Sequence, residues 1–229
     1  MAKKIVKKRK IKFFNLFLVL LILFGLGFGV YYSLQIPVHN IIIKNTNYLN
    51  DDMILELADI KDYPSFFLTS KKDVEKKLEK SPYIYRAKLK KKYGFIFIIE
   101  IRENRPLYYD TNDKKYVFDT GEKVDEDSTS MKFLVPRLLN YVPDQKNDKF
   151  LVGMKNVHLA ILSKISDIEY QPNDYDKDRF LLYMSDGNMV YLTLTKFKII
   201  NHYNEVYKQL EGHKGILYLD NGNHFEIRE

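Results

Sequence analysis

The stretch FFNLFLVLLILFGLGFGVYY, residues 13–32, contains no charged residue. Fourteen of its 20 residues are Leu, Ile, Phe or Val, and each of these favours membrane insertion by roughly 0.3 to 0.6 kcal/mol at a helix centre. Twenty residues at about 1.5 Å of rise make a helix of roughly 30 Å, which matches the hydrocarbon core of a bilayer. We therefore predict a transmembrane helix over residues 13–34.

The segment before this helix predicts its orientation. Residues 1–12 contain seven Lys or Arg residues and no acidic residue, and such flanks stay in the cytoplasm. Tyr31 and Tyr32 fall where the outer aromatic belt is expected. We expect a single-pass membrane protein with a cytoplasmic basic tail that contacts lipids and an extracytoplasmic remainder. The alternative is a cleaved signal peptide, whose apolar core is usually only about 7 to 15 residues long and is followed by a small-residue cleavage site.

Charge is balanced outside the tail. The net charge of +7 equals the seven basic residues of the tail, so the other 30 basic and 30 acidic residues cancel. This balance argues against a nucleic-acid-binding protein, which needs a basic face. Residues 37–106 hold 14 basic and 10 acidic side chains, whereas residues 107–229 hold 16 and 20. This shift predicts two domains that meet near Pro106. Cysteine is absent, which excludes disulfides and thiolate sites.

The first predicted domain has the element order strand, helix, helix, strand, strand. Residues 38–45 are rich in β-branched side chains and predict a strand. Asn50 and Ser70 are predicted N-caps of two helices. Alternation of apolar and basic residues from Tyr85 onwards, followed by the apolar run 95–101, predicts two further strands. The fold class is therefore α+β.

The second predicted domain is β-rich with two helices. Apolar residues at helical spacing predict helices over about 148–165 and 196–211. Asp186-Gly187 and Asn221-Gly222 each stand between apolar runs and predict hairpin turns. The last of these hairpins joins predicted strands over 215–219 and 224–227.

Several segments resemble one protein family. In the first domain they are residues 36–52, SPYIYRAKL at 81–89 and IEIRENRP at 99–106. Their order directly after a membrane anchor resembles a POTRA domain, and their details resemble the FtsQ/DivIB family of bacterial cell-division proteins. Leu89 replaces a usual Val and Asn104 a usual Arg of that family.

The resemblance continues through the second domain. It rests there on YVFDTGEKV at 116–124, VPRL at 135–138 and SDGNMV at 185–190. The stretch ILYLD at 216–220 is more apolar than the acidic strand that the family usually carries near its C-terminus. The resemblance covers the chain through the succession of these segments, since no one motif is specific by itself.

The resemblance implies a division scaffold whose C-terminal part binds FtsL- and FtsB/DivIC-type bitopic proteins. A chain that ends in a hairpin leaves an unpaired strand edge, and residues 216–219 carry no charge to protect it. We expect a partner segment to pair with this edge as an added strand. The alternative is that this stretch forms an ordinary central strand. The expected partner-binding residues are Ile216, Leu217, Tyr218, Leu219, Phe225 and Ile227.

The sequence gives little support for catalysis. The five histidines lack H-x-x-x-H spacing, and hydrolase and phosphate-binding motifs are absent. The acidic stretch DYDKD at 174–178 lacks the glycine and distal glutamate of an EF-hand, so a solvated turn is expected. We expect no enzyme activity, cofactor, metal or small-molecule substrate. The alternatives are a membrane-anchored cell-surface enzyme that acts on the wall and a POTRA-type secretion chaperone.

Overall fold

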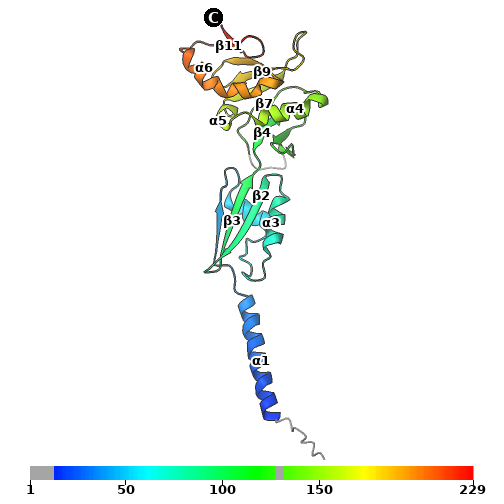
Figure 1. Cartoon of the computed structure of the whole chain (residues 1–229), viewed down its shortest axis with the longest axis vertical. Coiled ribbons are helices and arrows are strands. Elements are labelled where there is room, and N and C mark those ends of the chain that lie inside the picture. Colours follow the sequence, from blue (N-terminus) through cyan, green and yellow to red (C-terminus); the bar gives the residue numbers. More distant parts are fainter. Residues whose placement is uncertain (1–12, 127–131, 229) are drawn as a thin grey trace, which may run out of the picture. The chain divides into compact units, whose positions relative to one another are not determined.

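The computed structural model describes residues 13–126 and 132–228 (Figure 1). The basic tail, residues 1–12, and most of the polar stretch 125–130, predicted to be a loop, lie outside the described residues. The chain divides into two compact units, one ending at Arg102 and one beginning at Glu103. This division lies a few residues before the predicted boundary at Pro106.

Helix α1, Phe13–Leu34, has the predicted bounds. Among the described residues it is the one helix long and apolar enough to cross a membrane, and none of its residues is buried against the rest of the protein. An isolated helix with apolar side chains on every side needs an apolar environment. The helix is therefore consistent with a single-pass membrane anchor.

The rest of the first unit has the predicted element order. Its elements are β1 (Asn40–Lys44), α2 (Asp51–Ala58), α3 (Lys71–Glu79), β2 (Ile84–Lys92) and β3 (Ile96–Glu103). The sheet order is β1-β3-β2. Strands β1 and β3 are parallel, and their register runs from Asn40 opposite Ile96 to Lys44 opposite Glu100.

Both predicted N-caps of this unit are confirmed. The Asn50 side-chain oxygen accepts a hydrogen bond from the Met53 amide at 2.9 Å, and the Ser70 hydroxyl accepts one from the Asp73 amide at 3.4 Å. Each bond satisfies a backbone donor that the first helical turn leaves unpaired.

Strand β2 differs from its predicted phase at one end. Ile84 is buried, whereas Tyr85 is exposed and has the Arg102 guanidinium 4.6 Å from its ring centroid. The turn before β3 spans residues 93–95, so Phe95 lies in the turn and not in the predicted strand. Its positive φ of 59° ends the hairpin strand before Ile96.

The second unit contains one mixed sheet. Its described strands are β4 (Pro106–Asp110), β5 (Lys115–Phe118), β6 (Lys123–Asp125), β7 (Arg137–Leu138), β8 (Ile165–Tyr170), β9 (Arg179–Met184), β10 (Met189–Thr193), β11 (Gly215–Tyr218) and β12 (His224–Ile227). They lie in the order β12-β11-β10-β9-β8-β7-β4-β5-β6. Both predicted hairpins, β9–β10 and β11–β12, are present and antiparallel.

The two predicted helices of this unit had the wrong bounds. The described helical elements are α4 (Asp144–Lys155), α5 (Leu159–Leu162), the 3₁₀ helix η2 (Leu194–His202) and α6 (Tyr203–Gln209). Helix α4 ends at Lys155 because a side chain that is distant in the sequence, that of Asn201, bonds the backbone just after it. The Asn201 amide group donates to the Asn156 carbonyl at 2.8 Å and accepts from the His158 backbone N–H at 2.7 Å.

The core of the second unit lies between these helices and one face of the sheet. The Phe150 ring from α4 stacks on Phe180 from β9 at 4.9 Å, and Phe197 from η2 meets both rings edge-on. Tyr191 and Tyr218, whose side chains alternate with buried ones, are half-buried. The sheet therefore has one face packed on helices and one face that is more open.

Candidate partner-binding surface

Strand β11 is an interior strand, which corrects the expectation that residues 216–219 form a free edge. It pairs in parallel with β10 and antiparallel with β12. The connection through η2 and α6 brings the chain back beside β10, so the following hairpin strand takes the outer position. The alternative of a central strand was the right one, and β12 is the edge.

The predicted binding residues lie on both faces of this hairpin. Leu217 and Leu219 belong to the buried core, with 4% and 6% of their surface exposed. Phe225 packs partly against the same core, whereas Ile227 is 55% exposed. Further members, Ile216 and Tyr218, are half-buried on the opposite face. The structure thus brings the six residues onto one hairpin without forming one continuous exposed patch.

The backbone of β12 presents an open edge. The Arg228 amide donates to the Lys214 carbonyl at 2.9 Å. Because residues of an antiparallel strand alternate in the direction of their N–H and C=O groups, Glu226 also faces β11. Phe225 and Ile227 therefore direct their backbone groups away from the sheet. These are the groups that an added strand would bond.

A buried amide holds the start of β11 in place. Asn188, which is 1% exposed, accepts a hydrogen bond from the Gly215 amide at 2.9 Å and donates to the Tyr203 hydroxyl at 3.0 Å. The Tyr203 hydroxyl donates in turn to Asp186 at 2.8 Å. Burial, and then this bond to Asp186, raises the pKa of Tyr203, so the hydroxyl remains a donor. The network joins the β9–β10 turn, α6 and β11.

Gly215 allows β12 to approach closely. A Cβ atom at this position would lie 2.0 Å from the Glu226 carbonyl oxygen and 2.8 Å from the Phe225 ring. Any side chain at position 215 would therefore force β12 to move away from β11. The sequence identified Gly215 only as the beginning of a strand, because the contact is with a residue on the neighbouring strand.

Aromatic and cationic side chains stack across the open face of the sheet. The Arg179 guanidinium lies 3.4 Å from the Tyr191 ring centroid. Tyr191 stacks on Tyr218 at 5.4 Å, and Tyr218 on His224 at 4.6 Å. These residues come from β9, β10, β11 and β12, so the stack ties the terminal hairpin to the rest of the sheet.

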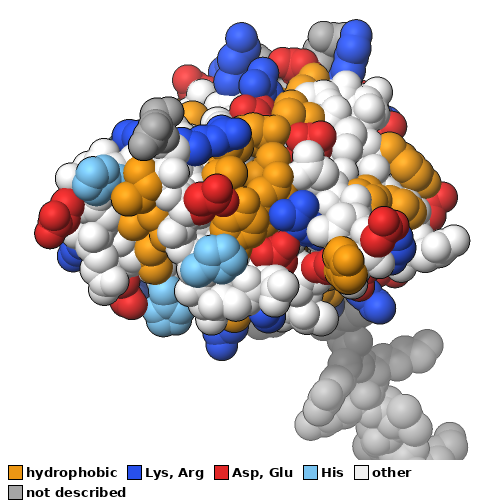
Figure 2. Space-filling model, turned by 90° about the horizontal axis from the view of Figure 1, so that it is seen from above, with side chains coloured by type: hydrophobic (Ala, Val, Ile, Leu, Met, Phe, Trp, Pro, Cys, Tyr) orange, Lys and Arg blue, Asp and Glu red, His pale blue; other side chains and the backbone are white. Residues whose placement is uncertain are grey.

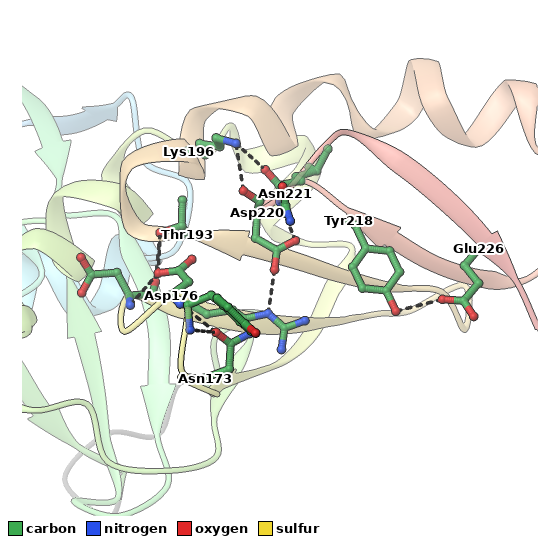
Figure 3. Close-up of polar contacts among 12 residues, drawn as sticks. Asn173, Asp176, Thr193, Lys196, Tyr218, Asp220, Asn221 and Glu226 are labelled. Atoms are coloured by element: carbon green, nitrogen blue, oxygen red, sulfur yellow. Dashed lines mark hydrogen bonds and ion pairs between the residues drawn. The ribbon is translucent and has the colours of Figure 1, made fainter.

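Polar contacts fix the turn after β11 (Figure 3). The Arg179 guanidinium donates to the largely buried Asp220 carboxylate at 2.7 Å. Lys196 donates to the carbonyl of Asp220 at 3.1 Å, and the Tyr218 hydroxyl donates to Glu226 at 3.0 Å. Burial and the Glu226 carboxylate raise the pKa of Tyr218.

The acidic stretch 174–178 forms the expected kind of turn. The Asn173 side-chain oxygen accepts from the Tyr175 and Asp176 amides at 2.9 and 2.7 Å, and Asp178 pairs with Lys146. The described residues contain no group of three or more His, Asp or Glu placed to hold a metal ion.

The molecular surface carries apolar side chains between charged ones. Figure 2 shows hydrophobic side chains gathered in bands on one face, with charged and histidine side chains beside them. Exposed large apolar residues of the second unit include Ile199, Tyr207 and Ile227. Bands of apolar surface such as those in Figure 2 are typical of sites that contact other proteins.

Comparison with known proteins identifies the first unit. Residues 36–104 match the POTRA domain of the FtsQ type. Separately, 48% of this chain aligns with 96% of a solved structure, the major extracytoplasmic domain of the trans isomer of the bacterial cell division protein DivIB from Geobacillus stearothermophilus. The identity is 22% and the TM-score is 0.39.

Curated relatives extend the similarity to the second unit. The chain is 25% identical over 221 residues to cell division protein DivIB of Geobacillus kaustophilus. This alignment covers 94% of this chain and 82% of the relative. It is 25% identical over 230 residues to cell division protein DivIB of Bacillus subtilis. This alignment covers 98% of this chain and 85% of the relative. These relatives support a role in cell division. Residues 36–104 thus form a POTRA domain of the FtsQ type, and the chain is similar to DivIB cell division proteins along most of its length.

Proposed function

We propose that this protein is a bitopic, non-enzymatic scaffold of the division complex. Its basic tail (1–12) lies in the cytoplasm, the helix over 13–34 crosses the membrane, and two domains over 37–106 and 107–229 lie outside. The second domain binds FtsL- and FtsB/DivIC-type division proteins by strand addition at β12. Names of the relatives support the division role, and the geometry of the terminal hairpin supports the mode of binding.

The open edge of β12 is the observation that carries this proposal. Phe225 and Ile227 offer outward N–H and C=O groups to a strand laid beside them. Their side chains lie on the face of Leu217, whereas His224 and Glu226 lie on the face of the aromatic stack. A partner strand beside β12 would therefore meet apolar groups on one face and polar groups on the other, which favours an amphipathic partner segment.

The six predicted residues have different tasks in this proposal. Phe225 and Ile227 contact the added strand directly. Ile216 and Tyr218 meet partner side chains that reach across the open face. Leu217 and Leu219 lie in the core and act by holding β11, so a truncation at Gly215 would remove core residues together with the edge.

Substitution of Ile227 by proline tests strand addition. Proline removes one outward N–H donor and leaves the inward bonds of Glu226 and Arg228, and edge strands tolerate proline in that setting. We expect Ile227→Pro in the full-length protein to weaken binding of a DivIC/FtsL-type pair by about tenfold or more, since a lost bond together with a blocked approach exceeds roughly 1.4 kcal/mol. Binding is measured by titration in detergent or nanodiscs.

Ile227→Ala is the matched control. It keeps the backbone donor and removes only side-chain contact, so a smaller loss is expected. Equal unfolding temperatures of both variants and the parent protein confirm that the hairpin stays folded. If Ile227→Pro binds the pair as tightly as the parent protein does, addition of a strand at β12 is wrong.

A further inference from the structure

A short connection holds the folded part of the first unit close to the end of α1. Three residues, 35–37, separate Leu34 from Val38. An extended chain spans at most about 3.6 Å per residue, so the four steps from Leu34 to Val38 reach only about 14 Å. The polar interface of a bilayer extends roughly 5 to 8 Å beyond the hydrocarbon core on each side. Any part of the unit next to this connection therefore lies within or just above the lipid headgroups.

The loop over residues 63–68 is hydrogen-bonded to this connection. The Phe66 amide donates to the Ile36 carbonyl at 2.9 Å, and the Val38 amide donates to the Pro64 carbonyl at 2.9 Å. The Ser65 hydroxyl donates to the carbonyl of Leu34, the last residue of α1, at 2.5 Å. The loop is thereby fixed at the end of the unit that α1 enters.

The β2–β3 turn lies at the same end. Because β1 runs parallel to β3, both strands begin there, and the His39 amide donates to the Phe95 carbonyl at 2.8 Å. The side chain of Tyr93 in this turn is fully exposed. Two segments that are distant in sequence therefore meet around the point where the membrane helix ends.

Both segments expose apolar side chains on a rigid base. Phe67 is 49% exposed and Leu68 is 65% exposed. Beneath them the Phe66 ring stacks on buried Phe97 at 5.6 Å. The Lys91 ammonium donates to the Phe66 carbonyl and lies 5.2 Å from its ring centroid. Rings with one packed and one exposed side are typical of residues at a membrane interface.

Basic residues flank this apolar group in the sequence. Five lysines lie just before the loop, at the end of β2 or at the start of α3, against two aspartates. They are Lys61, Lys71, Lys72, Lys91 and Lys92, with Asp62 and Asp73. Partial burial, and the nearby charge of Lys71, lower the pKa of Lys91. An excess of lysines beside exposed aromatic and aliphatic side chains is suited to an anionic lipid surface.

We propose that Tyr63, Phe67, Leu68 and Tyr93 insert into the headgroup region of the bilayer that α1 crosses, with the flanking lysines on anionic lipid phosphates. The first unit then rests on the membrane at the loop and at the turn as well as being anchored by α1. The occupant of this apolar surface is lipid because the hydrogen bonds to Leu34 and Ile36 hold the loop at the end of α1, within reach of the headgroups.

The absence of tryptophan from the chain permits a direct test. Phe67→Trp in the full-length protein is reconstituted into vesicles of phosphatidylglycerol and phosphatidylcholine whose acyl chains are brominated near the headgroup. We expect quenching of at least half of its emission, relative to unbrominated vesicles. Tyr85→Trp is the control, since Tyr85 is similarly exposed but lies at the other end of β2; less than a tenth of its emission should be quenched.

Further arms separate the possible outcomes. Leu68→Trp replaces Phe67→Trp if the latter lowers the unfolding temperature, because Leu68 is the more exposed of the two. Lower quenching in pure phosphatidylcholine supports the role of the lysines, and equal quenching overturns that part. Equal quenching of the loop and control reporters overturns insertion. A loop reporter shielded from aqueous iodide but not quenched by brominated lipid shows a protein contact and also overturns it.

Discussion

Two edge strands of this protein, β2 and β12, differ in whether side chains bond their outward backbone groups. In the first unit, α3 covers the outer edge of β2, where the Glu79 carboxylate accepts from the Ala87 amide at 3.1 Å and the Glu75 carboxylate accepts from the Leu89 amide at 2.8 Å. No bond of this kind is found at Phe225 or Ile227 of β12 among the described residues. Acceptor side chains close an edge that is to stay unpaired, and their absence from β12 distinguishes an edge that is able to receive a partner.

Substitution of Gly215 by alanine is expected to have the largest effect on this comparison. A Cβ atom would lie 2.0 Å from the Glu226 carbonyl oxygen, so β12 would have to separate from β11. We expect a loss of at least about 1–3 kcal/mol in the free energy of unfolding, together with faster amide hydrogen exchange in β12. Urea unfolding and exchange followed by mass spectrometry measure both quantities.

Ile216→Ala is the neighbouring control for this substitution. It removes side-chain atoms on the open face and introduces no contact with β12, so the hairpin should stay paired. If the amides of β12 exchange as slowly in Gly215→Ala as in Ile216→Ala, the close approach at Gly215 is unimportant for the pairing of β12.

Removal of the acceptors over β2 should convert the closed edge into an open one. We expect Glu75→Ala combined with Glu79→Ala to cost about 0.5–1.5 kcal/mol of stability for each lost hydrogen bond. The freed amides of Ala87 and Leu89 should also promote concentration-dependent association, measured by sedimentation. The double Glu→Gln variant keeps an oxygen acceptor at each position and should remain as monodisperse as the parent. If the Ala and Gln variants associate to the same degree, the association results from loss of the two negative charges and not from the freed amides.

The smallest expected effect is the pH dependence of the ion pair on the face of the β2–β3 hairpin. The Lys90 ammonium lies 2.5 Å from the Glu100 carboxylate, and this hydrogen bond lowers the pKa of Glu100 below its ordinary value of 4.5. The folded state therefore binds the proton more weakly than the unfolded state does. Stabilisation is complete above pH 4.5 and is lost as the pH falls through the folded-state pKa.

Lys90→Met removes this ion pair and supplies the test. The stability deficit of this variant at neutral pH should shrink on acidification below pH 4.5, as measured by urea unfolding at a series of pH values. A deficit that is constant over this range would show that the pair does not contribute through the charge of Glu100.

Local signals predicted much of the fold. Asn50 and Ser70 mark helix starts because a cap bonds a donor only three residues away. Asp186-Gly187 marks a hairpin because Gly187 takes a positive φ of 91°, which a tight hairpin turn requires. In each case the deciding contact lies within a few residues, so the sequence contains it.

Contacts between distant residues could not be predicted in this way. The periodic apolar residues after Lys155 continue the helical pattern, yet the Asn201 side chain bonds the backbone there and the helix ends. The sequence of residues 216–219 suits an edge strand and a central strand equally. The parallel pairing with β10, a contact between distant residues, decides between them. The assignment of partner-binding residues depended on that neighbour, and this is why the edge was placed one strand too early.

The parallel pairing of β1 and β3 has a mechanical consequence. The membrane helix pulls on the chain before Asn40, whereas the second unit pulls beyond Glu103, and these points lie at opposite ends of the paired region because the strands are parallel. A pulling force between membrane and partner would therefore load the ladder from Asn40–Ile96 to Lys44–Glu100 in shear, all bonds together. Such an arrangement resists tension better than a ladder that opens one bond at a time.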